Sequence, residues 1–316
     1  MPEKMATVAW QGISVKVPPD WSLVGVSGDE KKGYLRVDGP VAASVEVRWS
    51  PGFGKAPDLK AKCREFLSNL EKTSRKKRVG FSSKVKSEGD DSRSIGFNWR
   101  ADRLGQGRML YCPDCDRVVI AQVVSSREEN VTAMSPMILG SLTDHRDDGW
   151  SNWALYGLEF AVPPGYRIEK HTMMSGYILL RFRRGAKMLA VQRWGLVKSI
   201  LGSDSLEQWY RKDVLPDMKG YRVGFSETEI AGHEAIKVAG RRGGVRQFVR
   251  SAAYSLTLHS YPDYATGYAW HCRDSNRLFG VRATHCQGED VVERIRDLIE
   301  CHRGGPSGER KTDTKE

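Results

Sequence analysis

The sequence has little of what a membrane-spanning, secreted or disulfide-bonded protein needs. No apolar run approaches the ~18–20 uncharged residues that span a bilayer, because Arg or Lys interrupts each run, as in Leu179–Arg183. The first ten residues, MPEKMATVAW, contain no apolar segment of the signal-peptide kind. Six cysteines in 316 residues do not make a disulfide framework. We therefore expect a cytoplasmic protein with reduced thiols and no membrane span.

Motifs of the common enzyme sites are also missing. The sequence contains neither a GxGxxG fingerprint nor a GxSxG elbow. Gly52–Lys55 ends like a phosphate-binding loop, but Trp49 replaces its first glycine and Ala56 its Ser or Thr. His233–Glu234 begins like a zinc-protease motif and lacks the second histidine. We predict no catalytic residue and no cofactor.

What the sequence has is the composition of a basic globular protein. Hydrophobic residues make up 40% and charged residues 28%, which excludes a disordered or fibrous chain. A length of 316 residues suits two domains of the usual ~100–200 residues. Lys and Arg number 50 against 39 Asp and Glu, and this excess favours encounters with acidic partners without specifying one.

The two halves of the chain repeat one another. Five blocks match in the same order, which indicates two copies of one domain, residues 1–147 and 148–303, followed by a polar tail at 304–316 that we expect to be disordered. The matched blocks are Gly12–Trp21 with Gly157–Tyr166, Gly33–Leu35 with Gly176–Ile178, Arg48–Trp49 with Arg193–Trp194, Arg78–Ser82 with Arg222–Ser226, and Cys112–Arg117 with Cys272–Arg277.

Each copy has the pattern of an α+β domain. Alternating apolar residues predict an opening strand at Ile13–Val17, which the following proline pair ends. A helix follows in each copy, with Asp58 as N-cap in the first and a Ser205–Gln208 capping box in the second. A closing helix is predicted over Asp290–His302, with a second capping box from Asp290 to Glu293. Runs of strands with few helices indicate two tandem α/β/α sandwich domains, each with a mainly antiparallel sheet flanked by helices. The other strands are expected at 33–37, 43–49, 81–85, 94–99, 108–112, 117–124, 234–238, 248–259 and 277–284.

These features resemble the PsbP-like superfamily, which includes the extrinsic subunit P of photosystem II and a Ran-binding nuclear transport factor. The resemblance lies in the Val-Pro-Pro-x-Trp/Tyr end of the opening strand, the hairpin that closes on Arg-Trp, and the Ile230–Ala235 turn before the later strands. It covers both halves and implies a binding module built on an antiparallel sheet. No functional residue is carried over, because no site motif of the superfamily maps here.

The sharpest local signal is the turn that both copies share. Cys112, Asp114 and Arg117 recur as Cys272, Asp274 and Arg277, and we interpret the pattern as a structural hairpin turn in which Asp and Arg pair. Cys112 and Cys115 are also the weak candidates for a zinc pair. Zinc needs two more ligands, and the remaining cysteines and histidines, His145 and His302 among them, lack ligand spacing. We predict no metal site.

Basic clusters are the candidate contacts for an acidic partner. The leading hypothesis is a non-enzymatic binding protein on a duplicated scaffold, with a protein as partner. The first alternative is a single-stranded nucleic-acid-associated protein that grips phosphates with these cations and stacks bases on interleaved aromatic residues. These aromatic residues are Trp194, Tyr254, Tyr261, Tyr264, Tyr268 and Trp270. The second alternative is a hydrolase or zinc-dependent protein. The candidate contact residues are Lys76, Lys77, Arg78, Arg181, Arg183, Arg184, Arg241 and Arg242.

Overall fold

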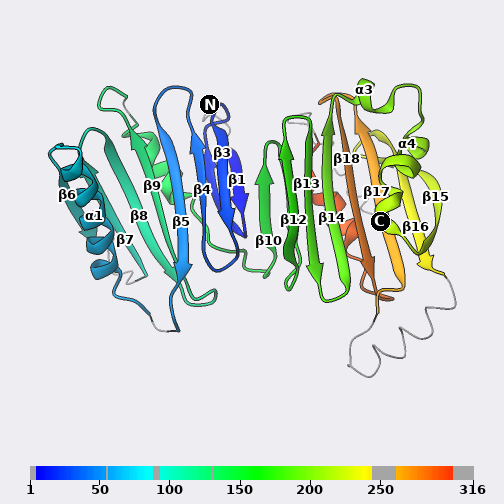
Figure 1. The fold of residues 1–316 in the computed structure, drawn as a ribbon, viewed down its shortest axis with the longest axis horizontal. Helices are drawn as coiled ribbons and strands as arrows, with labels where there is room; N and C mark the ends of the chain where they lie inside the picture. Colours follow the sequence, from blue (N-terminus) through cyan, green and yellow to red (C-terminus); the bar gives the residue numbers. More distant parts are fainter. Residues whose placement is uncertain (1–4, 55, 88–92, 130, 244–260, 302–316) are drawn as a thin grey trace, which may run out of the picture. The chain divides into compact units, whose positions relative to one another are not determined.

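The computed structural model describes residues 5–54, 56–87, 93–129, 131–243 and 261–301 (Figure 1). The chain divides into two compact units, which we call the first unit (Met1–Pro164) and the second unit (Gly165–Glu316). The α+β class is confirmed, since antiparallel sheets dominate and helices are few. The predicted strand at 248–259 and the tail at 304–316 lie outside the described residues. Within the described ranges, no helix has the length and apolarity to cross a bilayer.

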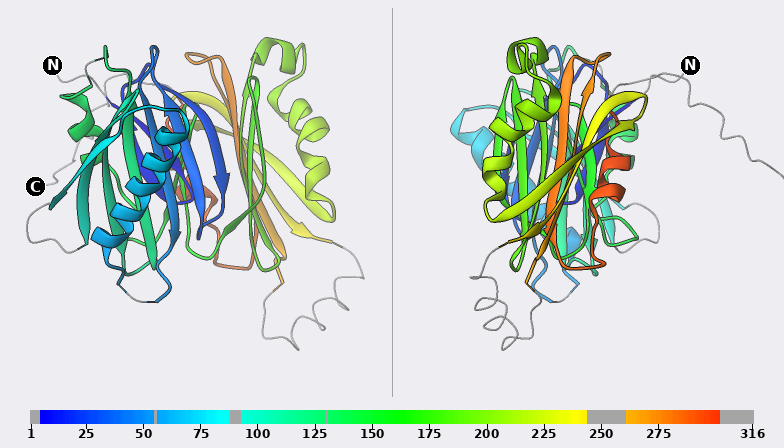
Figure 2. Two further views of the ribbon diagram at one scale, coloured as in Figure 1. Left: turned by 60° about the vertical axis from the view of Figure 1, so that its left-hand side comes forward. Right: turned by 90° about the vertical axis from the view of Figure 1, so that its right-hand side faces the viewer.

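The first unit is built on a seven-stranded antiparallel sheet in the order β3-β4-β5-β9-β8-β7-β6. Helices cover both faces (Figure 2): α1 packs against β6–β8, and α2 packs against β8 and β9. Met109 of β8 meets α1, whereas its neighbour Arg108 points to the α2 side, as alternation along a strand requires. The elements are β3 (Ser22–Gly28), β4 (Gly33–Asp38), β5 (Ser44–Pro51), α1 (Leu59–Lys76), β6 (Ser82–Ser87), β7 (Ser94–Arg100), β8 (Leu104–Cys112), β9 (Arg117–Ser125) and α2 (Met134–Gly140).

Helix α1 begins where the sequence predicts. The Asp58 side chain accepts a hydrogen bond of 2.9 Å from the Ala61 N–H and so caps the helix. Leu59, Cys63 and Leu67 recur every four residues and are buried. They form one apolar cluster with sheet residues such as Phe97 and Met109, and this cluster is the core beneath α1.

A small four-stranded sheet completes the first unit. Its order is β11-β10-β1-β2, from strands β1 (Ala6–Trp10), β2 (Ile13–Val17), β10 (Ser151–Leu155) and β11 (Leu158–Val162). The predicted opening strand is confirmed as β2. Its hairpin partner β1 pairs with β10 at Ala9 and Ala154, and the rings of Trp10 and Trp153 meet edge-on at 4.9 Å. The first unit therefore extends to Pro164, beyond the end of the first sequence copy at residue 147.

The second unit contains a seven-stranded antiparallel sheet in the order β12-β13-β14-β18-β17-β16-β15. Helix α4 packs against β16 and β17, and α6 packs against β17 and β18. The predicted capping box is confirmed, because Ser205 and Gln208 bond each other's backbone N–H groups. The elements are β12 (Arg167–Met174), β13 (Tyr177–Arg184), β14 (Lys187–Gly195), α3 (Val197–Leu201), α4 (Leu206–Asp213), the 3₁₀ helix η1 (Leu215–Met218), β15 (Tyr221–Ile230), β16 (His233–Arg242), β17 (Tyr264–Cys272), β18 (Arg277–His285) and α6 (Val292–Leu298).

The closing helix is shorter than predicted. Helix α6 begins at Val292 and ends at Leu298, and its N-cap residue, Val291, makes no side-chain capping hydrogen bond. The Asp290 carboxylate accepts from the N–H of Val292, two residues on, so the predicted capping box with Glu293 is wrong. An Asp side chain commonly accepts a hydrogen bond from the backbone N–H two residues on, which forms an Asx turn in place of the capping box.

The two seven-stranded sheets share one strand order, but one matched block does not superimpose in register. Trp49 pairs with Val119, whose neighbours Val118 and Ile120 belong to the cluster beneath α1, so Trp49 faces away from that helix. Trp194 pairs with Leu278 and packs edge-on against Trp209 of α4. A shift of one residue moves a side chain to the other face of a sheet. Matching Arg48–Trp49 with Arg193–Trp194 is therefore wrong as a structural equivalence.

Candidate functional site

The turn between β8 and β9 brings four metal-ligating groups together in the first unit. Cys112 ends β8, and Cys115 lies in the turn itself. One ligand atom from each of Cys112, Cys115, Asp144 and His145 lies within 4.8 Å of every other. The expectation that His145 lacks ligand spacing is wrong. Thr143 bonds the backbone of Ser14 in both directions, and this bridge holds the segment that follows α2 beside the turn.

The predicted pairing of Asp114 with Arg117 is also wrong. Arg117 is 6% exposed, and its Nη2 lies 2.6 Å from Oδ1 of Asp144. The same guanidinium donates hydrogen bonds to the backbone carbonyls of Glu30 (2.9 Å) and Asp144 (2.8 Å). Asp114 is exposed, and its carboxylate lies 3.6 Å from Nε2 of His145. Arg117 thus serves as an internal anchor for the turn and for the segment after α2.

Of the two thiols of the turn, Cys112 is buried and Cys115 is partly buried. Burial raises the pKa of the Cys115 thiol to about 12, and the negative charge of Asp144 adds to this rise. Burial also raises the pKa of Cys112, against hydrogen bonds from the backbone N–H groups of Cys115 and Asp114 that lower it. Both sulfurs are therefore protonated near neutral pH, and they do not have the thiolate character of reactive cysteines.

The equivalent turn of the second unit has a three-membered cluster. Ligand atoms of His233, Cys272 and Cys301 lie within 4.8 Å of one another. Burial raises the pKa of Cys301 to about 11. Asp274, like Asp114, faces a histidine, with 4.0 Å between its carboxylate and Nε2 of His233. The backbone explains why both turns have Asp or Asn at the fifth position. Asp116 and Asn276 have positive φ values of 47° and 49°, and Asp and Asn tolerate this left-handed conformation better than most residues.

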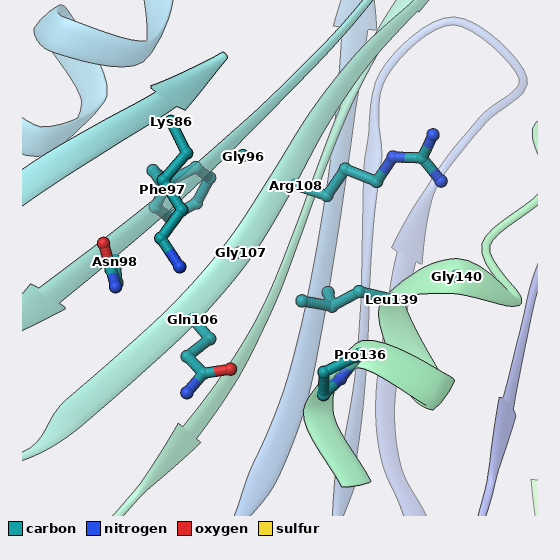
Figure 3. A pocket seen from close by; sticks show the side chains of 10 residues that line it. All are labelled: Lys86, Gly96, Phe97, Asn98, Gln106, Gly107, Arg108, Pro136, Leu139 and Gly140. Carbon is teal, nitrogen blue, oxygen red and sulfur yellow. The ribbon is translucent and has the colours of Figure 1, made fainter. Parts of the chain in front are cut away.

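A hollow lies on the α2 face of the first sheet (Figure 3). Polar side chains of β6, β7 and β8 form its floor, and Pro136 and Leu139 of α2 form one wall. Its volume is about 290 Å³, and an adjoining hollow of about 330 Å³ shares Asn98 and Gln106 with it. The alternation of lysines along β6 is the sequence signal that could have revealed this polar face. In the second unit the Tyr268 ring fills the equivalent place, beneath Arg296 of α6 at 4.6 Å.

The second unit gathers the predicted basic residues into one cleft, which we call the basic cleft. Arg181, Arg183 and Arg242 line it, together with Lys219 and Arg282, over a volume of about 180 Å³. Two carboxylates oppose these five cations. Asp217 pairs with the buried Arg282 at 2.7 Å, and Glu169 pairs with Arg181 (2.9 Å) and Arg183 (2.5 Å). Hydrogen bonding from Arg183 lowers the pKa of Glu169, which therefore stays ionised.

The other predicted contact residues do not line the basic cleft. Arg241 stacks over the Tyr264 ring at 5.4 Å, and Arg184 follows Arg183 at the end of β13. The predicted base-stacking residues differ in exposure, and Trp194, Tyr261 and Tyr264 are partly buried. Tyr268 and Trp270 are buried in the second sheet, and Trp194 packs on Trp209. Tyr254 lies outside the described residues. Lys76, Lys77 and Arg78 lie at the end of α1 in the first unit, where cations complement the helix dipole.

No protein-family model and no curated protein matches this chain. Solved structures of low similarity include the apo immunity protein TplEi of the type VI secretion system of Pseudomonas aeruginosa, with 9% identity over 94% of this chain and 96% of that one and a TM-score of 0.32. The same protein complexed with "L" peptide has 10% identity over 94% and 97% and a TM-score of 0.29. The Tle4–Tli4 complex has 10% identity over 95% and 98% and a TM-score of 0.30. Scores of this size establish neither a shared fold nor a shared function.

Proposed function

We propose that this chain is a non-enzymatic protein-binding protein whose basic cleft receives an acidic segment of a partner protein. The observation that carries the proposal is the gathering of Arg181 and Arg183 in one cleft with Arg242, which lies far from them in the sequence. Arg guanidinium groups bind carboxylates with two parallel hydrogen bonds, and they are enriched at protein interfaces.

The charge balance of the basic cleft supports an acidic ligand. Among the described residues, five cationic side chains line it, and Asp217 and the adjoining Glu169 are the carboxylates that oppose them. Glu169 is shared by two arginines, so one of them keeps an unneutralised charge. Nε of Arg242 is buried and donates no hydrogen bond within the described part of the chain. A carboxylate of the partner would relieve both deficits.

We further propose that the scaffold is a duplicated module of the PsbP-like type. The common strand order of the two seven-stranded sheets supports a duplication, and so does the shared turn that begins at Cys112 in one copy and at Cys272 in the other. The two copies differ in basic charge on the second strand of their seven-stranded sheets, which is β4 in the first sheet and β13 in the second. The first sheet neutralises Arg36 with Asp38 and Glu46, whereas the second sheet carries Arg181 and Arg183 on the corresponding strand. Divergence of this kind would leave one copy as scaffold and give the other the binding surface.

The test begins with partners cross-linked to the full chain in its native host. Binding of each candidate is then measured with the double charge reversal Arg183→Glu/Arg242→Glu, at low and at high salt. The matched control is Lys76→Glu/Lys77→Glu, which reverses two exposed charges at the end of α1. We expect the cleft variant to weaken binding at least tenfold and high salt to weaken the wild type.

Three results would contradict the proposal. Full binding by the cleft variant would remove the basic cleft as the contact. Loss of binding only in the control would move the contact to α1. A single-stranded oligonucleotide that binds the wild type and not the cleft variant, while no protein partner does, would favour nucleic acid.

A further inference from the structure

We propose that the first unit binds one zinc ion between Cys112, Cys115, Asp144 and His145. This inference concerns a different unit from the basic cleft and does not rest on the proposed function.

The spacing of the four groups fits a tetrahedral ion. Their ligand atoms all lie within 4.8 Å of one another. Zinc bonds of ~2.0–2.3 Å place neighbouring ligand atoms about 3.3–3.8 Å apart, so small side-chain rotations would close the site. The set contains two sulfurs, one nitrogen and one oxygen. Zinc accepts this mixture, whereas Mg²⁺ and Ca²⁺ require oxygen ligands.

The chain already orients two of the donors. Backbone N–H groups of Cys115 and Asp114 donate to the Cys112 sulfur. Nδ1 of His145 lies 3.0 Å from the carbonyl oxygen of Arg146. When Nδ1 carries the proton for that hydrogen bond, Nε2 keeps its lone pair and can bind a metal. A metal-ligating histidine usually donates its other ring N–H to an acceptor such as a backbone carbonyl.

The charges around the cluster also balance once an ion is present. Asp144 is 7% exposed, Arg117 lies against its carboxylate, and the thiols of Cys112 and Cys115 hydrogen-bond to it. Two thiolates and Asp144 carry three negative charges, which a Zn²⁺ ion and Arg117 match with three positive ones. Binding replaces two thiol protons by the ion and releases them to solvent. Because the ion displaces these protons, affinity should fall as pH falls.

The position of the cluster suits a structural ion. It joins the β8–β9 turn to the segment that leads from α2 to β10, and Cys115 and His145 are only partly buried, which leaves a path for the metal. Among the described residues, the cluster of the second unit has three donors, His233, Cys272 and Cys301, whereas a closed structural site takes four. We therefore assign the ion to the cluster of the first unit.

The test measures zinc in the untagged full chain under reducing conditions, followed by Co²⁺ substitution and competition with a chelator. We expect about one zinc per chain and a tetrahedral Co²⁺ spectrum with thiolate charge-transfer bands. Cys115→Ser and His145→Ala should each lower affinity at least tenfold. The matched controls are Cys286→Ser, which removes a partly exposed thiol of the second unit, and His171→Ala, which removes an exposed imidazole of β12.

Thermal unfolding keeps the test decisive if a variant folds poorly. A chelator should lower the Tm of the wild type and of both controls, and it should leave the Tm of Cys115→Ser and His145→Ala unchanged. Wild-type protein that takes up no zinc in competition with the chelator would overturn the proposal. So would cluster variants that bind as the wild type does. Zinc lost from Cys301→Ser and retained by Cys115→Ser would place the ion in the second unit and equally overturn the assignment.

Discussion

Nη2 of Arg117 lies 2.6 Å from Oδ1 of Asp144, and both side chains are more than nine-tenths buried. Arg117 begins β9, whereas Asp144 belongs to the segment between α2 and β10. The pair therefore joins the start of a central strand to a loop that is remote in sequence. Removing one member of such a pair leaves the other charge buried without compensation.

Arg117→Leu should accordingly destabilise the protein by about 3–5 kcal/mol. The measurement is chemical denaturation followed by tryptophan fluorescence. The matched control is Arg277→Leu at the equivalent turn, where the side chain is only partly buried and its charge lowers the pKa of the nearby Arg193. The control should cost less than about 1 kcal/mol. Equal losses of unfolding free energy in the two variants would show that the buried Arg117–Asp144 pair stabilises the protein no more than a partly exposed arginine does.

Local features of this fold could be predicted from the sequence, and features that depend on register could not. Asp58 and Ser205 mark helix starts because capping involves residues only two or three positions apart. Trp49 and Trp194 have the same sequence context and face opposite sides, because strand pairing sets the register and no local pattern encodes it.

The candidate sites follow the same division. Cys112 and Cys115 could be singled out from their spacing, since a turn alone brings them together. Asp144 and His145 join them through the pairing of Thr143 with Ser14, a contact across more than a hundred residues that spacing rules do not address. The basic cleft likewise collects Arg181 and Arg242 from strands that are not neighbours in the sheet.

Gly107 of β8 is a position where the first sheet tolerates no side chain. A Cβ atom there would lie 2.1 Å from the Phe97 ring, which the core beneath α1 holds in place. Gly107→Ala should therefore destabilise the protein by about 1–3 kcal/mol through overpacking. Gly80→Ala is the control, because a Cβ at Gly80 meets nothing within 4 Å. The comparison of the two midpoints in urea checks this, and a neutral Gly107→Ala would mean that Phe97 can move aside.

The capping box at the N-terminus of α4 allows a test of how much this cap stabilises the protein. Ser205 accepts from the N–H of Gln208, and its own N–H donates to the Gln208 side chain at 2.8 Å. Ser205→Ala should cost about 0.5–2 kcal/mol, because the Gln208 N–H at the helix start loses its acceptor. Ser203→Ala removes a hydroxyl two residues earlier, outside the cap, and should change stability little. Thermal unfolding of both variants decides between the outcomes, and equal Tm values would argue against the cap.

Glu293 of α6 makes the stability of the second unit depend on pH. The Tyr268 hydroxyl donates to its carboxylate at 2.7 Å, Lys237 lies 3.1 Å away, and both contacts lower the pKa of Glu293. A carboxyl whose pKa is lower in the folded chain contributes stability above its unfolded pKa of about 4.3, and that contribution disappears as pH falls through the folded value. Wild type should therefore be more stable than Glu293→Gln at neutral pH, and the difference should shrink as the pH is lowered below 4.3. Urea unfolding of both proteins across this range measures the difference, with Glu300→Gln as the control for losing one carboxylate from the same segment. A difference that stays constant or grows on acidification would show that the Tyr268 and Lys237 contacts do not favour the ionised form of Glu293.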